Sequence, residues 1–163
     1  MFSNDLTDIA TRLLEDLRAR DLRLVTAESC TGGLIAGCLT AVPGSSDVVD
    51  RGFVTYSNAA KQQMLGVPEA LLIAHGAVSA PVALAMAQGA LARSEADLAV
   101  SVTGIAGPGG GTATKPVGLV HLAAVSGSGA ERSERVIFDG DRDAVRQGAV
   151  VKALELLRAV AEG

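Results

Sequence analysis

Residues 22–33 read LRLVTAESCTGG, and this short stretch indicates the fold class. Its first half, from Leu22 to Ala27, is largely apolar and predicts a strand. Its second half turns polar, and Thr31-Gly32-Gly33 opens a run of small residues that predicts a helix over 31–39. A strand that passes through a tight polar corner directly into a helix is typical of α/β proteins.

The same alternation continues along the chain. Apolar residues recur every three or four positions between Leu6 and Leu17, which predicts a helix before this first strand. Further strands are predicted at 52–56, 97–103, 117–125 and 134–138. Further helices are predicted after Ser57, after Pro68, over 79–93 and from about 141. We expect one domain over residues 1–163. It should be a three-layer α/β/α sandwich whose mostly parallel sheet ends in an antiparallel edge hairpin.

Composition and charge argue against nucleic acid and membrane as partners, and the N-terminus argues against secretion. The net charge of −4 and the pI of about 5.1 argue against a nucleic-acid binder, which would carry a basic stripe. No apolar run approaches the ~20 residues that cross a bilayer, so we expect no membrane partner. The first five residues lack the features of a signal peptide, and we expect a cytoplasmic protein.

The two cysteines and two histidines suggest neither a disulfide nor a metal site. Cys30 and Cys38 are eight positions apart, which on one helix is ~12 Å and too far for a disulfide. His75 and His121 are the only histidines, and no Cys/His spacing is typical of zinc. We therefore predict no metal.

Three of the predicted strands end in polar corners, at residues 26–33, 56–61 and 103–111. If the strands are parallel, these corners converge, because ligands bind beyond the carboxyl ends of strands in open α/β sheets. Ser29 lies at the first corner. The amides of residues 30–33 would be free donors at a helix start and would suit an oxyanion or a phosphate. The alternative is that Ser29 or Thr31 merely caps the helix.

A serine nucleophile needs a base, and Lys61 is the best candidate. His75 and His121 fall at a helix end and inside a strand, positions that favour a structural role. Lys61 lies about one turn into the helix after the second strand, and burial would lower its pKa enough for it to act as a base. The alternative is an ordinary exposed helix lysine.

Two other groups at the first corner carry reactive chemistry. Cys30 is a rival nucleophile, because a helix N-terminus lowers the pKa of a thiol. Glu28 would either orient a partner or bind backbone at the corner, and we favour the second reading. The loop GIAGPGGGTATKP at 104–116 matches neither the P-loop nor the dinucleotide-binding pattern. It is either an anion-binding loop or a flexible connection.

Six blocks together resemble the CinA C-terminal domain family. They read AESCTGGLIAGCLTAVPGSS, YSNAAKQQMLGV, GAVS, SVTGIAGPGGG, KPVGLV and GDRDAVR, and they follow the family's order from about residue 5 to 160. The chain resembles the stand-alone form, since many relatives carry this domain behind a larger one. It departs from the expected pattern at residues 112–114.

Characterised members of this family are nicotinamide mononucleotide (NMN) deamidases. The resemblance therefore implies hydrolysis of NMN to nicotinic acid mononucleotide and ammonia, in pyridine nucleotide recycling, without metal or cofactor. It also suggests a homodimer. The competing interpretation is a non-catalytic module that binds a nucleotide or a phosphate.

The resemblance assigns roles to individual residues. Ser29 would be the nucleophile and Lys61 its base, acting directly or through Tyr56. The residues assigned to substrate binding or support are Cys30, Thr31, Gly32, Gly33, Ser46, Thr103, Gly104 and Arg142. Arg146 is a weaker candidate for contact with the substrate phosphate or ribose.

Overall fold

The computed structural model describes all residues from 1 to 163. The helices are α1 (Asn4–Ala19), α2 (Leu34–Thr40), α3 (Asn58–Leu65), α4 (Glu69–His75), α5 (Ala80–Ala92) and α6 (Arg142–Ala161), with a short 3-10 helix, η1, at Ser45–Asp47. The strands are β1 (Leu24–Glu28), β2 (Val49–Val54), β3 (Leu98–Gly104), β4 (Leu119–Ser126) and β5 (Glu131–Ile137). No helix has both the length and the apolar character needed to cross a membrane.

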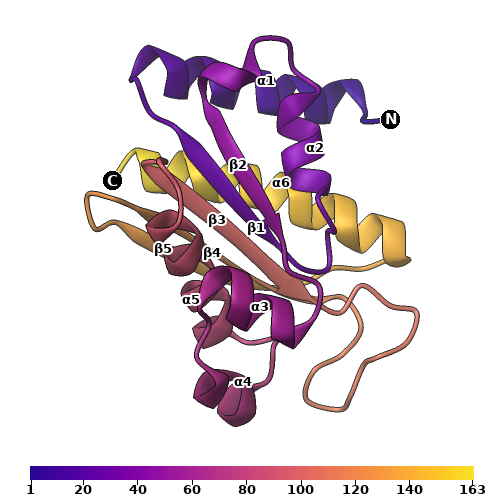
Figure 1. Ribbon diagram of the computed structural model, residues 1–163. Coiled ribbons are helices and arrows are strands. Elements are labelled where there is room, and N and C mark those ends of the chain that lie inside the picture. Colours follow the sequence, from indigo (N-terminus) through magenta and orange to yellow (C-terminus); the bar gives the residue numbers. More distant parts are fainter.

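The five strands form one mixed sheet in the order β2-β1-β3-β4-β5 (Figure 1). Strand β1 pairs in parallel with β2 and with β3, whereas β3–β4 and β4–β5 are antiparallel. The predicted α/β fold with an edge hairpin is confirmed.

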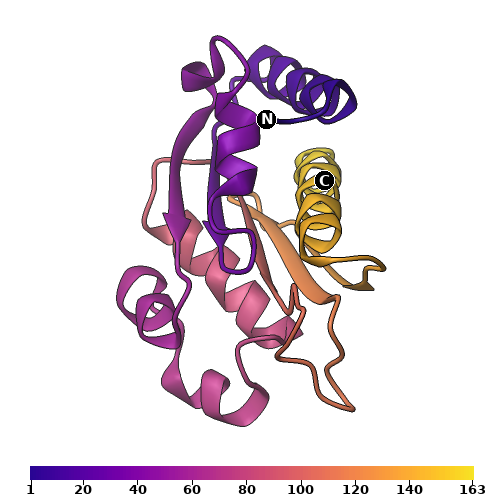
Figure 2. The same cartoon turned by 90° about the vertical axis from the view of Figure 1, so that its right-hand side faces the viewer.

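Helices cover both faces of the sheet, as Figure 2 shows edge-on. Helices α2 and α6 lie on one face with α1 packed over them, and their apolar residues form the larger core cluster. Helices α3, α4 and α5 form the other layer, with a smaller cluster centred on α5. Alternate residues of each strand feed the two clusters: Leu24 joins the larger one, whereas Val25 joins the smaller one.

The boundaries of two elements differ from the prediction in ways that affect the first corner. Helix α2 begins at Leu34 rather than at residue 31, because Gly32 (φ 58°) and Gly33 (φ 101°) adopt left-handed backbone conformations that interrupt a right-handed helix. Strand β2 runs over 49–54 rather than 52–56, so Thr55 and Tyr56 lie beyond its end. Both shifts lengthen the loops at the carboxyl edge of the sheet.

Helix α3 packs unusually closely against α5 at Gly89. The carbonyl oxygen of Leu65, the last residue of α3, occupies the place where a side chain at position 89 would begin. Helix α3 carries Lys61, so this contact helps to set how closely Lys61 approaches the sheet.

We predict that Gly89→Ala destabilises the protein by ~1–3 kcal/mol, because the new methyl group must push α3 and α5 apart. Urea unfolding followed by circular dichroism measures this change. Gly109→Ala is the matched control, since nothing lies within 4 Å of a Cβ at that position. Equal stability of the two variants would contradict the packing argument.

Candidate active site

A cavity of about 310 Å³ lies at the carboxyl ends of β1, β2 and β3. Its walls come from all three predicted corners, from residues 77–78 before α5, and from Arg142 at the start of α6. The expected convergence of the corners is therefore what the structure shows. It follows from the parallel pairing of the three strands.

Ser29 and Lys61 meet in this cavity. Lys61 Nζ lies 3.0 Å from Ser29 Oγ and also donates to the carbonyl oxygen of Thr55 at 3.0 Å. Lys61 is only 1% exposed and Ser29 only 8%. The alternative readings, an exposed lysine and a helix-capping serine, are both wrong.

Helix α3 directs Lys61 inward from its first turn. Ser57 caps the helix by accepting a hydrogen bond from the Ala60 amide at 3.0 Å. Asn58 and Lys61 are three positions apart and so share one face of the helix, and both line the cavity.

The electrostatic environment favours the neutral form of Lys61. Burial lowers the pKa of this amine, and the nearby Cys30 thiol opposes that shift only weakly. No carboxylate lies within ion-pair distance of its Nζ. An amine with this environment is suited to accept a proton from a hydroxyl beside it.

Glu28 binds backbone, as we favoured from the sequence. Its buried carboxylate accepts hydrogen bonds from the amides of Gly33, Ile35 and Ala36 at 3.1, 3.0 and 2.9 Å. It also accepts from Thr31 Oγ1 at 2.6 Å. Glu28 therefore caps α2 from the preceding strand.

This cap corrects the expected source of oxyanion donors. The amide of Gly33 is occupied by Glu28, and the amide of Gly32 donates to the Ser29 carbonyl oxygen at 3.0 Å. The side chain of Thr31 is likewise engaged by Glu28. Among residues 30–33, only the amides of Cys30 and Thr31 donate to no protein acceptor.

Cys30 is a poor nucleophile in this structure. Burial raises the pKa of its thiol to about 11, against weaker opposing effects of its own backbone amide and of nearby cations. The expected lowering by a helix N-terminus is wrong, because Cys30 precedes α2 by four residues and the helix start is already neutralised by Glu28. Both Cys30 and Cys38 are free thiols.

Tyr56 and Arg142 form the outer wall of the cavity. Arg142 Nη2 donates to the Tyr56 hydroxyl at 3.1 Å, and Nη1 donates to the carbonyl oxygen of Gly107 at 2.8 Å. Tyr56 is 62% exposed and has no hydrogen bond to Ser29 or Lys61. A proton relay through Tyr56 is therefore not built into the structure, where Lys61 contacts Ser29 directly.

Thr103 and Gly104 line the inner wall at the end of β3. The Thr103 hydroxyl donates to the Ala77 carbonyl oxygen at 2.9 Å and so fixes the segment before α5. A Cβ at Gly104 would lie 2.8 Å from the Leu119 carbonyl oxygen, so a glycine is needed there for sheet packing.

Five residues suggested by the resemblance do not line the cavity: Thr31, Gly32, Gly33, Ser46 and Arg146. Ser46 is an exposed residue of η1, which precedes β2 and so lies at the opposite end of that strand from the cavity (Figure 1). The order of the sequence blocks could not show this, because it does not reveal that β2 begins only after Ser46 and ends before Tyr56. Arg146 binds the Cys30 and Thr31 carbonyl oxygens and does not line the cavity either.

Other lining residues were missed by the sequence reasoning. Asn58 could have been found from its helical spacing to Lys61. Ala77 and Val78 belong to the quoted block GAVS, but no pattern indicated that this segment reaches β3. Neither His75 nor His121 lines the cavity. No group of three or more His, Cys, Asp or Glu side chains lies close enough together to hold a metal ion.

A sequence model of the CinA C-terminal domain matches residues 6–161. The chain belongs to the CinA C-terminal domain family. It is 50% identical over 157 residues to nicotinamide-nucleotide amidohydrolase PncC of Escherichia coli K12, a match that covers 96% of this chain and 95% of that protein.

The chain is also similar to a longer CinA-like protein and to two proteins of solved structure. A CinA-like protein of Anaeromyxobacter sp. strain K is 52% identical over 158 residues, but this chain spans only 38% of its length. The crystal structure of the competence/damage inducible protein CihA from Agrobacterium tumefaciens superposes with a TM-score of 0.97 at 53% identity, covering 99% of this chain and 98% of that one. A competence damage-inducible protein A from Klebsiella pneumoniae has a TM-score of 0.92 at 38% identity, covering 96% and 97%.

We predict that Glu28→Ala destabilises the protein by ~2–4 kcal/mol, because it leaves three amides of the α2 start without their acceptor in a largely buried place. Thermal and urea unfolding measure the loss. Asp141→Ala is the control: it removes another carboxylate cap, which accepts one amide at an exposed helix start. That loss should be nearer ~1 kcal/mol, and two equal losses would contradict the role given to Glu28.

We predict that replacing Lys61 by Met changes how stability depends on pH. Unfolding restores the ordinary lysine pKa of about 10.4, so between the lowered folded value and ~10.4 the unfolded wild-type chain binds more protons. Wild-type stability therefore rises with pH in that window, and the Met variant lacks this rise. Urea unfolding at several pH values tests the difference.

Lys152→Met is the control for this experiment. The hydrogen bond that Lys152 donates to Glu155, together with the charges of Glu134 and Glu155, raises the pKa of Lys152 despite slight burial. Wild-type stability due to Lys152 is therefore lost as pH rises past ~10.4, which is the opposite sign. A Lys61→Met variant whose pH dependence matched the wild type would show that Lys61 is charged in the folded protein.

Proposed function

We propose that this protein hydrolyses the carboxamide of NMN to nicotinic acid mononucleotide and ammonia. One observation carries the proposal: a serine hydroxyl and a buried lysine amine lie 3.0 Å apart in a cavity, in a chain that matches an amidohydrolase of nicotinamide nucleotides over nearly its full length. A neutral amine beside a hydroxyl is a known way to activate a serine nucleophile.

In the proposed first step, neutral Lys61 takes the proton of Ser29 while Ser29 Oγ attacks the carboxamide carbon. The Thr55 carbonyl oxygen, 3.0 Å from Lys61 Nζ, keeps the amine oriented toward Ser29. The positive charge of the pyridinium ring makes the carboxamide carbon more electrophilic. The same charge lowers the affinity of Lys61 for a proton before the reaction begins.

The developing oxyanion is assigned to the amide of Cys30. Cys30 directly follows the nucleophile and lines the cavity, and its amide donates to no protein acceptor. Amides that are already oriented bind a developing negative charge without the reorganisation that water requires. The amides of α2 itself are excluded from this role by Glu28.

Collapse of the tetrahedral intermediate breaks the carbon–nitrogen bond. Protonated Lys61 returns its proton to the leaving nitrogen, so ammonia departs and Ser29 carries the nicotinoyl group as an ester. A water molecule then attacks this ester with Lys61 again as the base, which releases the carboxylic acid and restores Ser29. The lysine takes up and returns one proton in each half-reaction.

The rest of the cavity suits the nucleotide part of NMN. The Arg142 guanidinium and the unpaired amides of Gly107, Gly109 and Gly110 form a rim that fits a phosphate. The exposed ring of Tyr56 offers an electron-rich face to the cationic pyridinium. Ser46 has no place in this proposal.

The wider setting is also proposed from the family likeness. We propose that the protein is a cytoplasmic homodimer that acts in pyridine nucleotide recycling without a metal or cofactor. Val54, exposed at the end of edge strand β2, is an apolar group that a second copy would cover. Light scattering on the purified protein measures the oligomeric state.

We predict that Ser29→Ala abolishes ammonia release from NMN and leaves the thermal stability nearly unchanged, whereas Cys30→Ala keeps most of the activity. Ammonia is measured by a coupled assay, and NMN binding by calorimetry. A dead Cys30→Ala variant beside an active Ser29→Ala variant would transfer the nucleophile role to the thiol. Wild-type protein that binds NMN and releases no ammonia would support the phosphate-binding module instead.

A further inference from the structure

One polar side chain of the catalytic cavity has no partner in the protein. The lining residues with a side-chain oxygen or nitrogen are Ser29, Tyr56, Asn58, Lys61, Thr103 and Arg142. All of them except Asn58 are hydrogen-bonded: Ser29 to Lys61, Tyr56 to Arg142, and Thr103 to the Ala77 carbonyl oxygen. The side-chain amide of Asn58 therefore remains free to bind a ligand in the cavity.

Asn58 lies nearer the mouth of the cavity than the catalytic pair. It is the first residue of α3, three positions before Lys61, so the two share one helix face and lie ~4.5 Å apart along its axis. Lys61 is buried with its amine at Ser29, whereas Asn58 is exposed. Arg142, from α6, and the glycine loop form the exposed rim.

Most hydrogen-bonding groups of NMN already have partners in the proposed complex. The carboxamide meets Ser29, Lys61 and the Cys30 amide at the floor of the cavity. The phosphate only accepts hydrogen bonds, and the Arg142 guanidinium and the free glycine amides donate them at the rim. The two ring hydroxyls of the ribose lie between these ends of the molecule. Asn58 is the one lining residue with an uncommitted side-chain oxygen and nitrogen to offer them.

An asparagine side chain suits a pair of neighbouring hydroxyls. Its carbonyl oxygen accepts and its NH₂ group donates, and each hydroxyl can do both. A phosphate could use only the NH₂ group. An aspartate in this place could also bind hydroxyls, but its negative charge one turn from Lys61 would raise the pKa of the amine and favour its charged form. A neutral amide binds the sugar without disturbing the base.

We propose that Asn58 binds the ribose hydroxyls of NMN and so selects a ribosylated nicotinamide over amides that lack the sugar. This inference rests on the proposed function and adds a specificity-determining residue that takes no part in the chemical steps. The ribose does not change during the reaction, so the contact stabilises substrate and transition state alike. Its loss should therefore raise KM and leave kcat nearly unchanged.

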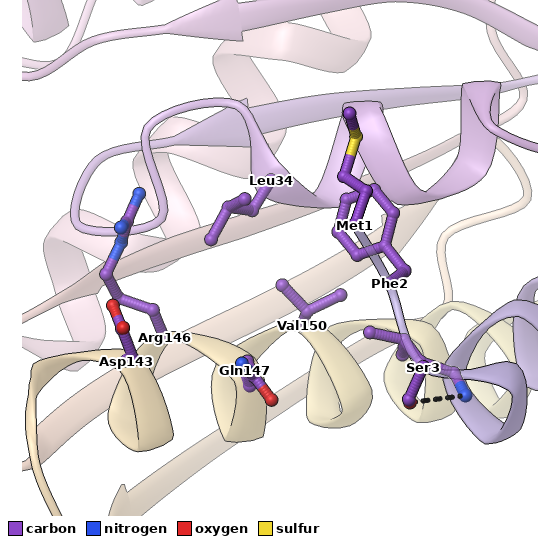
Figure 3. A pocket seen from close by; sticks show the side chains of 9 residues that line it. Met1, Phe2, Ser3, Leu34, Asp143, Arg146, Gln147 and Val150 are labelled. Carbon is purple, nitrogen blue, oxygen red and sulfur yellow. Dashed lines mark hydrogen bonds between the residues drawn. The ribbon is translucent and has the colours of Figure 1, made fainter.

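Asn4 provides a matched control for Asn58. It is likewise the first residue of its helix, α1, and follows a capping serine, Ser3. Its neighbours Phe2 and Ser3 line a separate cavity of about 200 Å³ between the starts of α1 and α2 and helix α6 (Figure 3). That cavity shares no lining residue with the catalytic one. Asn4→Ala therefore makes the same change at a helix start without touching the substrate.

The experiment measures ammonia release by wild type, Asn58→Ala and Asn4→Ala. The substrates are NMN and its dideoxy analogue, in which the ribose lacks both ring hydroxyls. For Asn58→Ala we expect KM for NMN to rise ~10-fold with kcat within about twofold of wild type, the size of one or two neutral hydrogen bonds. With the dideoxy analogue, wild type and Asn58→Ala should have equal kcat/KM. Asn4→Ala should match wild type with both substrates.

Three results would overturn the role of Asn58. The first is a KM of Asn58→Ala for NMN that equals that of wild type. The second is an equal loss with NMN and with the dideoxy analogue, which would show that the substitution disturbs the site rather than a ribose contact. The third is a fall in kcat with unchanged KM, which would mean that Asn58 acts on the reaction through Lys61.

A binding measurement separates this inference from the choice of reaction. Phosphoribose, the part of NMN without the nicotinamide, carries the hydroxyls and the phosphate but no amide to hydrolyse. Calorimetry should show ~10-fold tighter binding of phosphoribose to wild type than to Asn58→Ala, even if wild type releases no ammonia from NMN. Equal affinities, or no binding to either protein, would overturn the ribose contact even if NMN proves to be the substrate.

Discussion

The site depends on a lysine amine that is kept out of water without a carboxylate partner. Lys61 is bound only by the Ser29 hydroxyl and by the Thr55 carbonyl oxygen, two neutral groups. Burying a charged amine in this way would cost several kcal/mol, so the folded protein favours the uncharged form. Helix α3 tolerates the arrangement because its remaining contacts, including the close approach to Gly89 of α5, hold it against the sheet.

Two charged side chains, Glu28 and Arg146, bind backbone groups of the first corner. Glu28 satisfies the start of α2 and thereby removes the helix amides from the reaction. Arg146 approaches the same corner from the opposite direction and binds its carbonyl groups. Glu28 binds N–H groups of this corner and Arg146 binds its C=O groups, while the amide of Cys30, next to Ser29, donates to no protein acceptor.

Much of this arrangement could be predicted from the sequence, because it follows from local patterns and strand direction. The alternation of strands and helices predicted the layers, and parallel strands bring their carboxyl ends to one edge. Ser29 and Lys61 could be paired for that reason. The start of α2 was misplaced, because only coordinates show that Gly32 and Gly33 have positive φ.

The remaining misassignments concern long-range packing. The contacts of Arg146 depend on how α6 crosses the larger core cluster, more than a hundred positions from Cys30, and no local pattern encodes that crossing. The resemblance left open a proton path through Tyr56, but in the structure the Tyr56 hydroxyl accepts a hydrogen bond from Arg142 instead. The substrate-binding role suggested for Ser46 is not supported, because Ser46 precedes β2 and the cavity lies beyond the other end of that strand.

The two halves of the site come from opposite faces of the sheet. The turn with Ser29 is fixed by α2 and α6, whereas Lys61 is carried by α3, which packs with α5 on the other face (Figure 2). Neither layer alone brings the hydroxyl and the amine together. A substitution far from the cavity that shifts either helical layer against the sheet therefore separates the Ser29 hydroxyl from the Lys61 amine.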